Sequence, residues 1–193
     1  MVGKVTSGRA AAEIVQSGDV IASNGYAGCG TPEELLLALS ERFQETGAPR
    51  DLTLMYGGGQ GDSADRGLNR LGEPGLLKRV IGGHYGLMPA IEQLAVAGEI
   101  EAYNFPEGVI VQLYRDIAGR RPGTFSRVGL GPFVDPRIDG GRMNERTTEE
   151  LVEVTTIDDQ EYLFFRAFPI NVALIRGTTA DPDGNITMER EAL

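Results

Sequence analysis

The sequence predicts an α/β protein built on an open, mainly parallel sheet with helices on both faces. Short apolar segments with strand character alternate with helical segments, and each of the first four predicted strands ends in a turn marked by glycine or proline. This alternation is typical of βα units, whose strands end at one common edge of the sheet. A chain of 193 residues, 41% of them hydrophobic, is long enough to bury the core of one domain.

The first unit begins with a short N-terminal helix and continues into a strand over residues 19–23. The loop over residues 24–30 (N-G-Y-A-G-C-G) then leads to a second helix. Thr31 is predicted to cap this helix, with Pro32 in the first turn and Glu34 completing a capping box.

The next units follow the same plan. Their predicted elements are strand 51–56 with loop 57–62, strand 80–81 with loop 82–86 and a helix over 89–97, and strand 99–103 with a helix after it. An irregular segment follows residue 119, and then come an antiparallel hairpin (152–157 with 162–167) and a sheet strand at 172–176. Because Met188–Leu193 reads like the opening of another element, residues 1–193 are interpreted as one domain that is incomplete at its C-terminal end.

The composition argues against several classes of partner. Eighteen basic and 28 acidic residues leave a net charge of −10 without a basic stripe, which argues against binding nucleic acid or an anionic membrane. No apolar run approaches the roughly 18 residues of a membrane span, so a cytoplasmic location is expected. A single Cys29 and a single His84 provide neither an internal disulfide nor a His/Cys cluster, and no metal is expected.

The turn at residues 103–108 (Y-N-F-P-E-G) places a carboxylate where the fourth strand passes into a helix. Pro106 suits the first helical position and Asn104 the cap, so Glu107 is expected in the first turn, near the positive end of the helix dipole. Turns at this edge of an open α/β sheet line the ligand crevice. Glu107 is therefore a candidate functional residue, and the alternative is that it only complements the dipole.

Two further features each allow two interpretations. His84 and Tyr85 follow the third strand, and the imidazole suits acid–base chemistry, although a hydrogen-bonded pocket histidine is the simpler reading. The glycines of residues 25–30 would let backbone N–H groups approach a phosphate, or they only make tight turns. They lack the G-x-G-x-x-G spacing, and no G-x-x-x-x-G-K-[ST] motif occurs, so neither common nucleotide fingerprint is present.

Several ordered motifs resemble those of family I coenzyme A transferases. Residues 23–35 (S-N-G-Y-A-G-C-G-T-P-E-E-L) resemble the family's front glycine loop, which typically reads G-G-F-G-x-C-G-x-P-E-x-L. The other matching segments are residues 62–67, 82–86, 104–109, 129–141, 154–162, 176–179 and 184–185, which resemble the acyl-CoA:acetate and 3-ketoacid branch. The resemblance extends over nearly the whole chain.

The resemblance implies a CoA-transferase (NagB/RpiA-like) fold of two related α/β halves, of which this chain is most of the first, or alpha, half. It implies that the chain takes part in moving CoA between a short-chain acyl-CoA and a carboxylic acid. In the family, a glutamate on the second half attacks the acyl-CoA and passes through an acyl-glutamate anhydride to a glutamyl-CoA thioester. The motif around that nucleophile is absent, so the isolated chain is expected to be inactive. Coenzyme A is then a substrate, and no permanently bound cofactor is expected.

The resemblance also suggests which residues meet the substrate. The segment Asn24, Gly25, Tyr26, Ala27 and Gly28, together with Gly108, would line the acyl pocket, with His84 and Tyr85 flanking it. At the position of Glu107 the family usually has Gln, whose side-chain N–H helps to hold an oxyanion. An ionised carboxylate cannot donate, and the loss of one such donor typically costs ~3 kcal/mol of transition-state stabilisation.

Two alternatives stay open at this point. Glu107 would serve as the catalytic carboxylate of an acyl-CoA hydrolase or lyase, or the chain would be a non-catalytic subunit that binds a partner. The expected partners are acyl-CoA and carboxylate substrates, the second (beta) half of the enzyme and further copies in a homo-oligomer, without nucleic acid or membrane.

Overall fold

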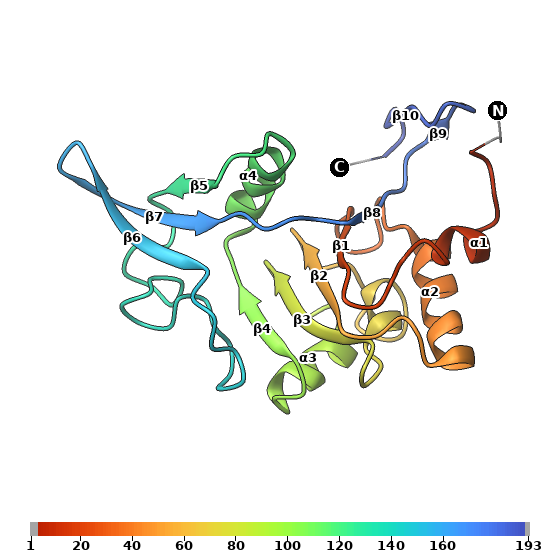
Figure 1. Cartoon of the computed structure of the whole chain (residues 1–193), viewed down its shortest axis with the longest axis horizontal. Coiled ribbons are helices and arrows are strands. Elements are labelled where there is room, and N and C mark those ends of the chain that lie inside the picture. Colours follow the sequence, from red (N-terminus) through yellow and green to blue (C-terminus); the bar gives the residue numbers. More distant parts are fainter. Residues whose placement is uncertain (1–3, 192–193) are drawn as a thin grey trace.

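The computed structural model describes residues 4–191 and centres on a five-stranded parallel sheet (Figure 1). The strand order is β4-β3-β2-β1-β8, with β1 at Val20–Ser23, β2 at Leu52–Tyr56, β3 at Leu77–Gly82, β4 at Glu101–Asn104 and β8 at Val172–Leu174. All four pairings in this sheet are parallel. The predicted open parallel sheet is therefore confirmed, and the first four strands deliver their loops to the same edge.

Neighbouring residues on the central strands enter two separate hydrophobic cores. Leu54 and Val80 belong to the core on one face, whereas Met55 and Ile81 belong to the core on the other, as the twofold alternation of a strand requires. The first face is covered by four helical elements, α1 (Gly8–Ala12), α2 (Glu33–Thr46), the 3₁₀ helix η1 (Leu68–Leu71) and α3 (Pro89–Val96). The central strands are thus covered on both sides, which explains the apolar runs in β1 (V-I-A) and at the end of β2 (L-M-Y).

Among the described residues, one helix covers the second face, α4 (Glu107–Ala118), together with a small antiparallel sheet. That sheet has the order β5-β7-β6 and consists of β5 (Gly123–Ser126), β6 (Val152–Ile157) and β7 (Gln160–Arg166). It lies beside α4 in Figure 1. The predicted hairpin is confirmed as β6 and β7, and its turn is reduced to Asp158 and Asp159, both with positive φ. A further short hairpin, β9 (Thr179–Ala180) with β10 (Ile186–Thr187), follows β8.

Two predicted helix starts are wrong. Helix α2 begins at Glu33 after Pro32 without a side-chain cap, because the Thr31 hydroxyl instead donates to the carbonyl oxygen of Ala27 at 3.1 Å. Helix α4 begins at Glu107, with Pro106 outside it in an extended conformation (ψ 129°). Asn104 cannot cap this helix because it is the last residue of β4, where its side chain donates to the carbonyl oxygen of Gly83 at 3.2 Å.

Two further observations concern the length of the helices and the C-terminal end. Within residues 4–191, no helix is long and apolar enough to cross a membrane. The element expected to open at Met188–Leu193 falls partly outside the described residues, which end at 191.

Candidate functional site

The loops that follow the parallel strands meet at the carboxyl edge of the sheet. We call residues 24–30 the front loop and residues 57–61 (G-G-G-Q-G) the triglycine loop. The N–H of Ala27 donates to the carbonyl oxygen of Gly59 at 2.7 Å, and the N–H of Gly83 donates to that of Gly57 at 2.9 Å. The triglycine loop is therefore held between the loops that follow β1 and β3.

Two predicted site residues lie against the triglycine loop, where a Cβ atom has no room. A Cβ at Gly58 would lie 2.3 Å from Cδ2 of Tyr26, and one at Gly59 would lie 2.7 Å from Nδ1 of His84. Both side chains are nevertheless exposed to solvent. Glycine at positions 58 and 59 therefore allows the Tyr26 and His84 side chains to pack directly on the backbone of this loop.

Glu107 stands next to the same loop. A Cβ at Gly83 would lie 2.4 Å from Cγ of Glu107 and 2.4 Å from the carbonyl oxygen of Gly57. Glu107 is exposed and is the first residue of α4, where the helix dipole favours a negative charge. Gly108 beside it is also exposed, and a Cβ there would meet nothing within 4 Å. A carboxylate, a phenol and an imidazole thus surround one glycine-rich backbone segment at the surface.

The front loop owes its shape to a tight turn and one clamp. Tyr26 and Cys29 exchange two backbone hydrogen bonds of 2.9 Å, and Gly25 has φ +117°. The Asn24 side chain accepts from the N–H of Arg176 at 2.9 Å and donates to its carbonyl oxygen at 3.1 Å. Its amide is thus engaged with the main chain after β8, so Asn24 acts here as a structural link.

Tyr85 does not join its sequence neighbour His84 at the surface. It is 5% exposed, and its hydroxyl donates to the carbonyl oxygen of Tyr103 at 2.9 Å inside the core. Burial raises the pKa of the Tyr85 phenol well above its ordinary value. Alternation along the chain places His84 outward and Tyr85 inward, so only His84 contributes to the surface group.

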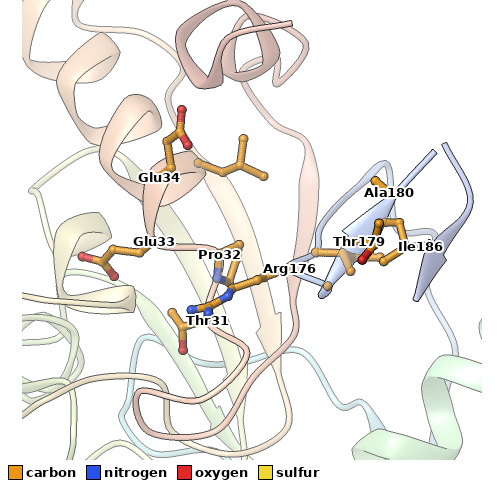
Figure 2. A pocket seen from close by; sticks show the side chains of 11 residues that line it. Thr31, Pro32, Glu33, Glu34, Arg176, Thr179, Ala180 and Ile186 are labelled. Atoms are coloured by element: carbon orange, nitrogen blue, oxygen red, sulfur yellow. The ribbon is translucent and has the colours of Figure 1, made fainter. Parts of the chain in front are cut away.

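Two cavities lie beside the front loop, and two arginines that sequence reasoning missed line them. A cavity of about 290 Å³ includes Ala27, Gly28, Arg66 and Arg176 in its lining. Another of about 460 Å³ lies between the start of α2 and the β9–β10 hairpin, and Figure 2 shows Arg176 there beside Thr31. Glu107 lines neither cavity.

The two arginines are held differently. The main-chain N–H of Arg66 donates to Oδ1 of Asp62 at 3.1 Å. This hydrogen bond is the main reason why the pKa of the Asp62 carboxyl is lowered. The Arg176 guanidinium lies 3.3 Å from a carboxylate oxygen of Glu191. Both arginines lie in segments that resemble the family motifs, 62–67 and 176–179, but an arginine by itself carries no signal of its position in the fold. Within residues 4–191, no three His, Cys, Asp or Glu side chains are grouped as a metal site would require.

Comparison with known proteins gives matches over nearly the whole chain. Residues 5–193 match the family model described as "Coenzyme A transferase". The chain is 44% identical to the caffeate CoA-transferase of Acetobacterium woodii over 188 residues. This alignment covers 97% of the chain and 36% of the caffeate CoA-transferase. It is 30% identical to the acetate CoA-transferase subunit alpha of Escherichia coli strain K12 over 179 residues. This alignment covers 92% of the chain and 71% of that subunit.

Solved structures agree. The apoenzyme of the acyl-CoA transferase YdiF from Escherichia coli O157:H7 superposes with a TM-score of 0.93 at 38% identity, covering 96% of this chain and 36% of that one. Glutaconate coenzyme A-transferase from Acidaminococcus fermentans, at 18% identity and a TM-score of 0.72, shares the fold. The chain thus spans about a third of its single-chain relatives, and it belongs to the family I coenzyme A transferases, where it corresponds to their N-terminal portion or alpha subunit.

Proposed function

We propose that the chain forms the first half of an acyl-transfer site that moves CoA between a short-chain acyl-CoA and a carboxylic acid. The observation that supports this most is the arrangement of Tyr26, His84 and Glu107 around the triglycine loop, at the carboxyl edge of the sheet. Ligands of open α/β sheets bind at this edge. In this proposal the front loop and Gly108 line the acyl pocket, and His84 flanks it.

The nucleophile is proposed to come from a second half of the enzyme. The chain covers 36% of a single-chain relative, which leaves room in that protein for a second half. Another relative is named as a subunit alpha, which supports a separate partner subunit in enzymes of that kind. The glutamate of this second half would attack the acyl-CoA carbonyl carbon, release the CoA thiolate and form an acyl-glutamate anhydride. The thiolate would then attack the glutamyl carbonyl, expelling the first acid and leaving a glutamyl-CoA thioester for the acceptor acid.

The first half would supply electrostatic stabilisation and shape. Backbone N–H groups of a glycine-rich loop are donors fixed in place before the reaction, and such donors stabilise a developing oxyanion. Arg66 and Arg176 would add positive charge beside Ala27 and Gly28 for an anionic part of a substrate, in a cavity that Glu33 and Asp62 also line. Glu107 is unfavourable in this role, because an ionised carboxylate repels an oxyanion.

A specific observation favours a second candidate, an acyl-CoA hydrolase or lyase in which Glu107 is the essential carboxylate. Within the described part of the chain, no hydrogen bond or ion pair engages the Glu107 carboxylate. A free carboxylate at a surface site is available as a general base or nucleophile.

The Glu107→Gln variant of the complete enzyme separates the two candidates. As a transferase, the variant should keep or increase CoA exchange between acetyl-CoA and propionate or butyrate, because the amide restores a donor. That donor is worth up to ~3 kcal/mol, or about a hundredfold in rate. Abolished thioester turnover would instead identify Glu107 as the catalytic carboxylate.

Glu92→Gln is the matched control. Glu92 is likewise an exposed glutamate in the first turn of a helix, α3, and lines neither cavity beside the front loop. Its replacement removes the same charge–dipole interaction, worth about 0.3–1 kcal/mol of stability, and should leave turnover unchanged. A complete enzyme that exchanges no CoA with any carboxylic acid would refute the transferase proposal itself.

A further inference from the structure

Gln60 is a fully buried polar residue at the base of the front loop. It lies in the triglycine loop and is 0% exposed. Its Oε1 accepts from the hydroxyl of Ser23 at 2.7 Å, and its Nε2 donates to the carbonyl oxygen of Ser23 at 3.1 Å. Ser23 is the last residue of β1 and directly precedes the front loop. The Gln60 amide therefore bonds to both the side chain and the main chain of Ser23, the residue before the front loop.

The backbone of Gln60 is itself fixed from the core side. Its N–H donates to Sδ of Met88 at 3.3 Å, and its carbonyl oxygen accepts from the N–H of Leu68 at 2.8 Å. A Cβ at Gly67 would lie 2.4 Å from that carbonyl oxygen, so the 3₁₀ helix closes tightly over it. Buried hydrogen bonds of this kind cannot be replaced by water and therefore restrain geometry.

The link is close to the proposed site. Gly59, the residue before Gln60, accepts from the N–H of Ala27 in the middle of the front loop at 2.7 Å. The front loop is therefore attached to the triglycine loop at its start through Gln60 and at its middle through Gly59. These two attachments set the position of Tyr26 relative to Gly57. The carbonyl oxygen of Gly57 and the Glu107 side chain both lie close to Gly83.

We infer that Gln60 is a positioning residue for the acyl site: it fixes the front loop over the triglycine loop and acts on the reaction only through that loop. This inference rests on the proposed function. Packing alone does not call for an amide at a fully buried position, because burial of a polar group is unfavourable unless it is hydrogen-bonded. The β1–β2 ladder already joins Ser23 to Tyr56 without it.

The lone cysteine provides a reporter of loop position that does not depend on activity. Cys29 is the only cysteine in the sequence, and it is exposed within the front loop. The rate at which a thiol reagent such as Ellman's reagent modifies it will respond if the loop shifts. Global stability is measured separately by urea unfolding.

The test compares Gln60→Met with Asn144→Leu in the complete enzyme. Asn144 donates its side-chain N–H groups to the carbonyl oxygens of Ala95 and Ile100, at the amino end of β4, opposite the proposed site. Both variants should lose stability. Only Gln60→Met should change the Cys29 modification rate severalfold and lower kcat for CoA exchange about 10- to 100-fold, with a smaller change in KM.

A second variant guards against failure to fold. Ser23→Ala removes only one hydroxyl group, and it should shift the Cys29 rate in the same direction as Gln60→Met. The double variant should show less than the summed effects, because both changes break one interaction. An unchanged Cys29 rate in Ser23→Ala and Gln60→Met, despite lost stability, would show that Gln60 only stabilises the fold and would overturn the inference.

Failure of the proposed function is a separate result. If the parent enzyme exchanges no CoA while the Cys29 rate still responds to Ser23→Ala, the transferase proposal fails and the control of the front loop by Gln60 stands. If the parent enzyme is active and neither kcat nor the Cys29 rate responds, the inference about Gln60 fails and the transferase proposal stands.

Discussion

Gly83 and Gly108 offer a sharp test of the packing around Glu107, because the same substitution should have opposite effects at the two positions. A Cβ at Gly83 would lie 2.4 Å from the carbonyl oxygen of Gly57 and 2.4 Å from Cγ of Glu107. A Cβ at Gly108 would meet nothing within 4 Å. Neither glycine has a positive φ, so alanine is compatible with both backbones and the difference is steric.

The structure sets the expected sizes. An ordinary contact for a Cβ begins at 3.4 Å, so Gly83→Ala must move Gly83 about 1 Å away from the triglycine loop. This movement breaks the 2.9 Å hydrogen bond from the N–H of Gly83 to the carbonyl oxygen of Gly57. Overpacking costs about 1–3 kcal/mol and a lost hydrogen bond about 1 kcal/mol, so the free energy of unfolding should fall by about 2–4 kcal/mol. Gly108→Ala removes a glycine from helix α4 and should raise that free energy by about 0.5–1 kcal/mol.

Urea unfolding followed by circular dichroism measures both changes as shifts of the midpoint at constant slope. The reasoning is refuted if Gly83→Ala stays within about 0.5 kcal/mol of the parent, or if Gly108→Ala destabilises by more than about 1 kcal/mol. Gly108→Ala also tests the proposed acyl pocket, since a stabilised variant that loses CoA exchange in the complete enzyme has a blocked site and not a damaged fold.

Three further predictions concern the second core and its support. Phe105→Ala should lower the free energy of unfolding by about 3–5 kcal/mol in urea, because this 1% exposed ring packs edge-to-face on two aromatic neighbours. Burial raises the pKa of Tyr103 to about 12, so the folded state keeps a proton that the unfolded state loses near pH 10, and stability should fall as the pH rises from about 10 to about 12. Tyr103→Phe should flatten this fall. Asp135 accepts from the Arg137 guanidinium, which holds the pKa of that carboxyl well below its usual range, so its contribution is present above about pH 4 and is lost in stronger acid. Asp135→Asn should remove part of this acid dependence and cost about 1.5–3 kcal/mol at neutral pH.

The sequence by itself was sufficient for the parallel sheet, the β6–β7 hairpin, the family and the edge that carries the candidate site. These follow from local signals, since strand and helix periods, turn residues and ordered motifs are all contained in short segments. Tyr26, His84 and Glu107 were placed near one another because parallel strands carry their following loops to a common edge.

Only the tertiary structure decided how individual polar groups are used. Asn24 pairs with Arg176, which lies 152 residues away in the sequence, and the Thr31 hydroxyl bonds within the front loop where a capping box was expected. The Tyr85 side chain is buried in the core, and the Gln60 side chain bonds to Ser23 at the start of the front loop. A local pattern sets the period and direction of a side chain, but its hydrogen-bond partner depends on which distant segment the fold brings within about 3 Å, and that choice is made by packing over the whole molecule.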